Sequence, residues 1–465
     1  MGLDIFIVIV YLAILVAMGF LGGKSVENAG DFTASGKRYG APVIFASLAA
    51  SYIGGGYSSG NAAEAFSSGI GMTIALFGFS IATIFTGKYL VPGISRFEGA
   101  ASTGEIIARS YGKKAGVVTG LFAFFCCAGV VGAQMEAMGV VFHSLLSIPP
   151  AAGILLGCGI VLLYSTAGGL QSVIAADMVQ FILLAVGMPL LLILSLHRAG
   201  GIGAVIQATP SSFFDPLNGT TLPGFLSLAV TMTFGEMLVP PYTQRLLIGK
   251  NHRSTAKGTV ASGLFSIPFF IMTGLIGLTA RALRVTEQPA EAMPQLILQV
   301  LPTGIRGVVM AAMVSIMLSA ADGFLNGAAV SLVRDVVRPL CPTLSDKKEL
   351  RWLRATNFLT GLTAVLVALF IPNIFRILIL AYSCWSPVIV IPLAAALLGV
   401  KSDRRAFFKA LAAGLITTLV WDHLLKQPAT VTGTTVGIFA NFLVFWWQTR
   451  RYRRHASQTL QLHCQ

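Results

Sequence analysis

Residues 46–66 read "ASLAASYIGGGYSSGNAAEAF", a glycine-rich stretch. It lies between apolar runs that are long enough to cross a membrane, yet glycine occurs at positions 54, 55, 56 and 60. Each glycine inside a helix costs about 0.5–1 kcal/mol relative to alanine. The stretch therefore predicts a membrane helix that is interrupted.

The composition is that of a polytopic membrane protein. Of the 465 residues, 55% are hydrophobic and 11% are charged, whereas soluble proteins average about 25% charged residues. The net charge of +14 does not indicate nucleic-acid binding, because the basic residues lie between apolar segments and not on one soluble face. The six cysteines mostly fall in apolar runs without metal-ligand spacing, so we interpret them as small hydrophobic residues.

Thirteen windows of about 20 apolar residues predict transmembrane helices. They lie near 2–22, 41–66, 70–94, 115–144, 148–167, 172–196, 223–248, 258–280, 303–335, 354–372, 373–399, 405–424 and 431–448. The first window lacks a basic leader and a clear cleavage site, so we interpret it as a retained helix. The connections are too short for a separate soluble module, and residues 1–465 are predicted to form one all-α transmembrane domain.

The basic residues are divided unequally between the two sides of this predicted arrangement. One set of connections carries 26 of the 32 Lys and Arg residues: 24–38, 88–114, 245–257, 334–354, 401–409 and 450–454. The opposite set carries the other 6. Because basic connections stay in the cytoplasm, the N-terminus is predicted outside and the C-terminus inside.

Five acidic residues fall inside the predicted spans: Glu64, Glu136, Asp177, Glu236 and Asp322. A charge at membrane depth costs about 2.5–3.5 kcal/mol, so each marks a candidate functional site. For Glu64 and Glu136, pairing with a neighbour that only fixes packing is an equally open interpretation.

Two of these acids belong to polar stripes on otherwise apolar helices. Asp177 and Gln180 share one helix face, and Ser319, Asp322 and Asn326 recur at helical spacing on another. Sodium prefers hard oxygen ligands, which such stripes and the carbonyls of a broken helix supply together. The sequence therefore predicts a cation site at the glycine-rich break. The alternative for the glycines is close packing of helices through small residues.

Several motifs in order resemble the sodium/solute symporter family over nearly the whole chain. They are "ENAGDFTASGKRYG", "YSTAGGLQSVIAADMVQ", "YTQRLLIGKN" and "LSAADGFLNGAAVSLVRDVVRP". Within the family, "IGGGYSSGNAAEA" and "PAEAMPQLILQVLPTGIRG" are most similar to the branch that contains the high-affinity choline transporters.

The resemblance implies a transporter core of two inverted five-helix repeats, at 41–196 and 223–399, with broken first and sixth core helices. Residues 1–40 would form an extra N-terminal helix and loop, and residues 400–465 two peripheral helices and a basic cytoplasmic tail. The implied activity is sodium-coupled symport of a small polar organic solute by alternating access in a bacterial inner membrane. Neither an enzymatic activity, a nucleic-acid partner nor an obligatory protein partner is expected.

The family's main sodium site maps onto backbone carbonyls and one hydroxyl, which the resemblance assigns to Ala50, Ile53, Ile316 and Ser319. Family members usually carry a second hydroxyl at the next position, where this chain has Ala320. The resemblance therefore implies a sodium site with one ligand fewer.

A further cation site that occurs in some family members would draw on Asp177, Ser319 and Asp322. Gly323 lacks the hydroxyl that is often found at its position. Sodium-independent transport, or proton coupling through Asp177 and Asp322, is the alternative that the missing hydroxyl at Ala320 favours. A membrane sensor that binds solute without moving it is a second alternative.

The candidate substrate-binding residues surround the two predicted breaks, and they are Tyr52, Gly55, Gly56, Tyr57, Gln134, Glu236 and Val239. The tryptophans of the choline branch's aromatic cage align with Tyr52, Val130 and Val239, and all five tryptophans of this chain lie at or beyond Trp352. Choline is therefore expected to be at best a poor ligand.

Glu236 lies in "TFGEMLVPPYTQR", just before the Pro240–Pro241 pair that breaks the sixth core helix. Its carboxylate is expected either to face a cationic substrate or to pair with Arg245.

We predict that reagents added outside intact cells do not label Cys464, because the charge asymmetry places the C-terminus in the cytoplasm. A variant that retains only this cysteine should react with a membrane-impermeant maleimide only after permeabilisation. Labelling in intact cells would contradict the predicted number of spans.

Overall fold

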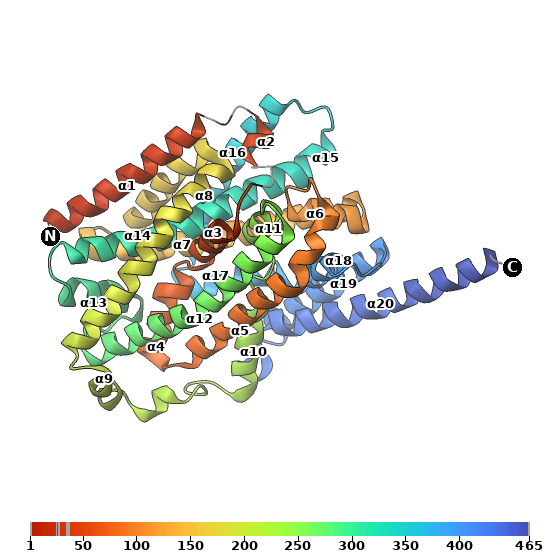
Figure 1. The fold of residues 1–465 in the computed structure, drawn as a ribbon. Coiled ribbons are helices and arrows are strands. Elements are labelled where there is room, and N and C mark those ends of the chain that lie inside the picture. The colour runs from red at the N-terminus through yellow and green to blue at the C-terminus, as the bar shows by residue number, and fades with distance from the viewer. Residues whose placement is uncertain (1, 25, 27, 34–37, 464–465) are drawn as a thin grey trace.

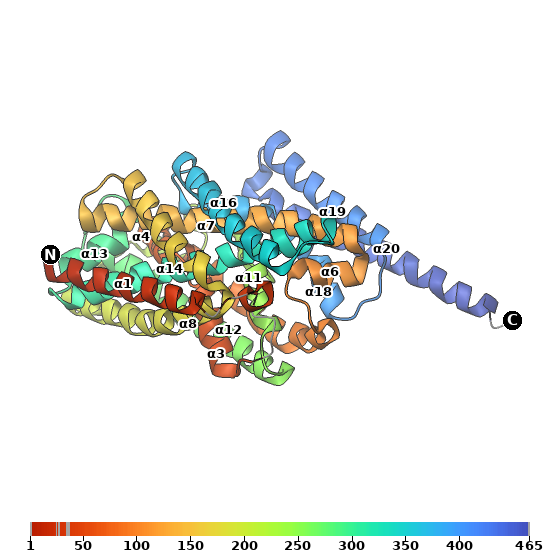
Figure 2. The same ribbon diagram turned by 90° about the horizontal axis from the view of Figure 1, so that it is seen from above.

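The computed structural model describes residues 2–24, 26, 28–33 and 38–463 (Figure 1). Cys464 and residues 34–37 of the first family motif lie outside the described residues. Figures 1 and 2 show an elongated bundle of helices, with the N-terminus at one end and the last helix extending beyond the other. The described residues form no strand, only an isolated bridge between Tyr39 and Gly249. The predicted all-helical fold is confirmed.

The first part of the chain forms α1 (Gly2–Gly23), α2 (Ala29–Phe32), α3 (Ala41–Tyr52), η1 (Gly56–Gly60), α4 (Asn61–Ser68), α5 (Gly71–Phe85), η2 (Thr86–Leu90), η3 (Val91–Phe97), α6 (Thr103–Tyr111), α7 (Lys113–Leu146), α8 (Pro150–Arg198), α9 (Ile202–Ala208) and η4 (Ser211–Phe214).

The second part forms α10 (Leu222–Phe234), α11 (Pro240–Leu247), α12 (His252–Ala282), η5 (Pro289–Glu291), α13 (Ala292–Val300), α14 (Ile305–Val330), η6 (Ser331–Val337), α15 (Arg338–Leu340), α16 (Asp346–Phe370), α17 (Ile374–Ser383), η7 (Ser386–Val390), α18 (Ile391–Leu397), α19 (Arg404–Leu419), η8 (Val420–Leu424), η9 (Pro428–Thr430) and α20 (Gly433–His463).

In the part of the chain that the structure describes, nine helical runs are long and apolar enough to cross a membrane, by length and composition alone. Three shorter apolar helices, at Ala41–Tyr52, Pro150–Thr166 and Leu222–Phe234, end at kinks or breaks. Each is too short to span by itself, because a straight span needs about 20 residues. The number of thirteen spans therefore stays a prediction.

The kink in α8 lies at Gly169, which has a φ of 57°. A side chain at this position would also collide with the backbone of Phe32. Only glycine meets both conditions at low cost. The kink separates the two windows that the sequence predicts at 148–167 and 172–196.

The most buried long helix is α14 with its continuation, in which 94% of the apolar window at Ile305–Leu340 is buried. It packs against α8, α7, α1 and α16. By contrast, only 22% of the α1 window is buried. The polar stripe of α14 therefore faces other helices and not the surroundings of the protein.

The extra N-terminal helix α1 is held to α14 by Asp4. The carboxylate accepts hydrogen bonds from the backbone N–H groups of Gly304 and Gly307, at 2.8 and 3.1 Å. It also forms an ion pair with Arg306, with Nη2 2.6 Å from Oδ2. An anion at a helix N-terminus satisfies amides that have no partner within the helix. Asp4 thus fixes α1 beside the most buried helix of the bundle.

Candidate functional site

The first break separates α3 from η1, at residues 53–55. The N–H of Gly54 would continue the helix by bonding to the carbonyl of Ala50, but it donates to the carbonyl of Tyr52, at 2.8 Å. The N–H of Gly55 donates to Oε1 of Gln134, at 2.6 Å, and not to the carbonyl of Ser51. The carbonyls of Ala50 and Ser51 thus lose their helical donors, as the glycine pattern predicts.

Ala320 of α14 lies next to this break. A methyl group added at Gly54 would lie 3.0 Å from Cβ of Ala320 and 2.8 Å from the side-chain amide of Gln134. A side chain at position 320 therefore points at the broken segment. Ile316, one turn earlier on the same helix, is fully buried.

The second break separates α10 from α11, at residues 235–239. Leu238 has a φ of 57°, a conformation that non-glycine residues seldom adopt and that often occurs at functional sites. Nε1 of the fully buried Trp385 donates to the carbonyl of Met237, at 3.0 Å. A tryptophan thus lies beside this break, although it comes from a position that the sequence did not single out.

Asp177 is the centre of a buried network between four helices. Ser47 of α3 donates to its Oδ2 at 2.5 Å, and Ser319 of α14 donates to its Oδ1 at 2.7 Å. Arg245 of α11 completes the network through an ion pair, with Nη2 2.8 Å from Oδ2, and both side chains are fully buried. The hydroxyl of Ser319 keeps its lone pairs for a cation while it donates its proton to the carboxylate, whereas that of Ser47 also accepts a hydrogen bond from Nε of Arg245.

The interpretation that Arg245 pairs with Glu236 is wrong. Its guanidinium bonds to Asp177, to Oγ of Ser47 at 2.8 Å and to the carbonyl of Pro241 at 3.0 Å. A Cβ at Gly323 would lie 3.2 Å from Nη2 of Arg245. The guanidinium therefore occupies the side of Gly323 where other family members are expected to carry a hydroxyl.

Polar side chains of the two stripes, and one hydroxyl of α3, are buried without a hydrogen bond of good geometry among the described residues. They are the carboxylate of Asp322, the side-chain amides of Gln180 and Asn326, and the hydroxyl of Ser51. All four residues are fully buried. The hydroxyl of Tyr164 and the backbone N–H of Gly323 lie next to the Asp322 carboxylate, but no ion pair to it exists among the described residues. Buried polar atoms normally have partners, and those that lack one can mark ion or water sites. Asp322 is thus a better candidate than Asp177 for a carboxylate that binds a cation.

Glu236 lies in the second break with 4% of its surface exposed. Tyr382 donates to its Oε1 at 2.8 Å, and Tyr242 donates to its Oε2. The hydroxyl of Tyr382 lies 3.3 Å from that of Tyr57. Tyrosines from three separate elements therefore meet at one carboxylate.

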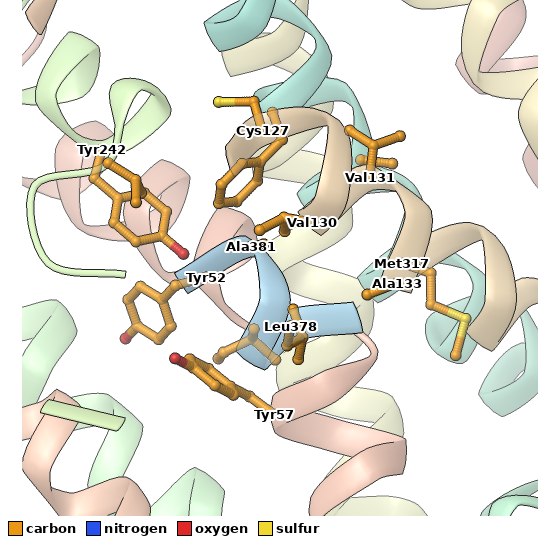
Figure 3. Close-up of a cluster of buried hydrophobic side chains, with 14 of the residues drawn as sticks. Tyr52, Tyr57, Cys127, Val130, Val131, Ala133, Tyr242, Met317, Leu378 and Ala381 are labelled. Carbon is orange, nitrogen blue, oxygen red and sulfur yellow. The ribbon is translucent and has the colours of Figure 1, made fainter. Parts of the chain in front are cut away.

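The predicted substrate-binding residues lie close to this carboxylate or to the first break. Figure 3 shows Tyr52 and Tyr57 in the same part of the core as Tyr242 and Val130. The rings of Tyr52 and Tyr242 are 6.4 Å apart. Val239 is fully buried.

Gly55 and Gln134 meet through the hydrogen bond described above, and Gly56 packs against Leu378 of α17. These three residues lie at the first break. Glu64 accepts a hydrogen bond from Ser68 at 3.2 Å, whereas Oε2 of Glu136 has no partner among the described residues.

Sequence reasoning missed Ser47, Tyr242 and Tyr382. Ser47 and Ser51 form a short polar face on the helix before the break, and Tyr242 follows the two prolines. The local sequence therefore gave a weak indication of Ser47 and of Tyr242. Tyr382 carried none, because it reaches Glu236 from 146 residues away.

The sequence is similar to those of several known transporters. It is 23% identical over 390 residues to the high-affinity choline transporter 1 of Drosophila melanogaster, covering 79% of this chain and 62% of that protein. It is 27% identical over 416 residues to the sodium/myo-inositol cotransporter 2 of Oryctolagus cuniculus, covering 78% and 60%. It is 24% identical over 411 residues to the sodium/glucose cotransporter of Vibrio parahaemolyticus, covering 79% and 74%. The matched part of the chain thus spans about three fifths of the length of the first two relatives.

The fold is similar to those of solved transporters. An outward-open, substrate-bound Na+-coupled sialic acid symporter matches with a TM-score of 0.81 at 15% identity, over 96% of this chain and 98% of the other. Inward-facing Mhp1 matches with a TM-score of 0.59 at 14% identity, over 92% and 94%.

The family profile described as "Sodium:solute symporter family" matches residues 32–416, which is most of the chain. The assignment to this family rests on that match, and the similarity to solved structures shows only that the fold is shared. The chain belongs to the sodium:solute symporter family.

Proposed function

We propose that the chain is a secondary active transporter that couples the entry of a small polar organic solute to sodium. One observation carries this proposal: the first break leaves carbonyls without their helical donors, and Gly54 of this break packs against Ala320 of α14. Carbonyl and hydroxyl oxygens are ligands that sodium prefers. The sodium ion would be cargo that moves with the solute. The ligand set would be Ala50, Ile53, Ile316 and Ser319.

The two breaks support alternating access. Irregular backbone at membrane depth is tolerated where it lines a cavity or binds something. We assign the first five-helix repeat to residues 41–196 and the second to residues 223–399. The broken helix is then the first helix of each repeat. The topology with an outside N-terminus and a cytoplasmic C-terminus belongs to this proposal, as does a bacterial inner-membrane location.

Proton coupling is the second candidate, and Ala320 favours it because it supplies no ligand oxygen for sodium. The ion pair with Arg245 stabilises the ionised form of Asp177, so a proton would have to be exchanged at another acid such as Asp322. Proteoliposomes separate the two candidates. An inward sodium gradient should accumulate the solute, whereas a pH gradient without sodium should not. Equal accumulation under a pH gradient alone would establish proton coupling.

We predict that Ala320→Ser tightens sodium binding about five- to thirtyfold. The added hydroxyl would point at the first break, where a neutral oxygen ligand contributes about 1–2 kcal/mol, by analogy with a hydrogen bond to a charged group. Ser319→Ala should weaken binding. Sodium titrations of both variants, followed by intrinsic fluorescence, measure the midpoints. Unchanged midpoints in both variants would show that the chain does not use this site.

We predict that Asp177→Asn lowers the yield of folded protein, because it leaves Arg245 buried without its counter-charge, at a cost of about 3–5 kcal/mol. The double variant Asp177→Asn/Arg245→Gln removes both charges and should recover the yield. If Asp177 also takes part in coupling, the double variant should keep a changed sodium midpoint. A wild-type midpoint in the double variant would restrict Asp177 to a structural role.

A further inference from the structure

Two cavities follow one another along α5 and α10. The larger, of about 280 Å³, is lined by Met72 of α5 and Met232 of α10. The smaller, of about 30 Å³, is lined by Phe79 of α5 and by Glu236, which follows α10. Met72 and Phe79 are seven residues apart on α5, which is about 10 Å along a helix, so the two cavities lie at neighbouring levels of the bundle. The two cavities together are called the route below.

Each cavity has one carboxylate and no basic side chain among the described residues that line it. Glu64 lines the larger cavity and Glu236 the smaller, and the other lining residues are apolar or carry hydroxyl or amide groups. Charges of one sign within low-dielectric walls concentrate ions of the opposite sign. The route therefore favours cations and disfavours anions and zwitterions, whose carboxylate would find no cation there.

The carboxylate of Glu236 keeps room for a ligand. No ion pair to it exists within the described part of the chain, since Arg245, the nearest basic residue in sequence, is bonded to Asp177. A carboxylate has about four acceptor positions, and Tyr242 and Tyr382 occupy two of them. A buried carboxylate without a cation is costly. A ligand that brings N–H donors and a positive charge would fill the vacant acceptor positions and compensate the buried charge.

Aromatic rings form the other wall of the smaller cavity. Tyr52, Tyr242 and Phe79 line it, with ring centroids 4.8 Å apart for Tyr52 and Phe79 and 6.4 Å apart for Phe79 and Tyr242. Aromatic rings attract a cation that lies over their faces. The free volume of about 30 Å³ holds one or two water-sized groups. It accepts an ammonium group, but not a sugar.

We propose that the solute is a small protonated amine whose ammonium group binds to Glu236 between these rings. The proposal rests on the proposed function, because it gives the transporter its substrate class. A primary or secondary ammonium donates N–H groups to the carboxylate, whereas a quaternary ammonium such as choline has none to donate. Glu64 attracts the same cation into the larger cavity.

Thermal unfolding of the purified protein in nanodiscs at pH 7 tests the substrate class, with butylammonium, its neutral analogue 1-butanol, choline and glucose as probes. Butylammonium should raise the unfolding temperature, and the other three should have little effect. Glu236→Gln should weaken butylammonium binding about tenfold or more, because it removes a charged acceptor. Glu136→Gln, which removes another acidic side chain from an apolar helix, is the matched control and should stay within about twofold of wild type.

The four probes on the wild-type protein test the substrate class even if Glu236→Gln fails to fold. Stabilisation by 1-butanol or glucose equal to that by butylammonium would overturn the amine class, as would unchanged butylammonium binding in a folded Glu236→Gln variant. Uptake of labelled butylammonium with and without a sodium gradient tests the proposed function separately. Binding through Glu236 without sodium-driven uptake would overturn sodium coupling and leave the amine site standing.

Discussion

A backbone N–H or carbonyl at membrane depth must find its partner within the protein, and the site depends on this constraint. The chain interrupts two apolar helices, at residues 53–55 and 235–239. At each interruption a side chain from another part of the chain supplies some of the missing bonding, Gln134 of α7 at the first break and Trp385, between α17 and η7, at the second. Because these side chains replace only part of the helical hydrogen bonding, some carbonyls stay free to bind a cation. The breaks are therefore stabilised and can still bind a ligand.

The second constraint is the cost of burying a charge. Two buried acids, Asp177 and Glu236, differ in the partners that offset this cost. Asp177 is fully compensated, by Arg245 and by two serine hydroxyls. Glu236 receives only hydroxyl donors. A buried ion pair is costly to break but contributes little net stability, so the Asp177–Arg245 pair fits a role in positioning α11 against α3 and α8. The carboxylate that lacks a cation is the better candidate for recognition of a charged ligand.

The two sites lie on the same broken elements, which gives a physical basis for coupling. Tyr52 ends α3 and lines the smaller cavity, while the carbonyl of Ala50, two residues earlier, belongs to the proposed sodium site. Arg245 and Tyr242 lie on α11, one on the Asp177 network and the other on Glu236. A cation that reorganised one break would therefore act on residues of the proposed amine site. Both ligands would favour the same conformation, which is what symport requires.

Several features of this protein could be predicted from the local chemistry of the chain alone. Hydropathy gave the membrane class and the helical windows, four glycines gave the first break, and Pro240–Pro241 gave the second. Helical spacing also placed residue 320 on the same face as Ile316 and Ser319, and the family resemblance directed that face toward the first break. Which charges and rings meet depends instead on how the helices pack. Arg245 reaches Asp177 across 68 residues and not Glu236 nine residues away, and Tyr382 reaches Glu236 across 146. Such partners are chosen by how α11 and α17 pack against the rest of the bundle, and spacing along one helix carries no information about contacts between helices.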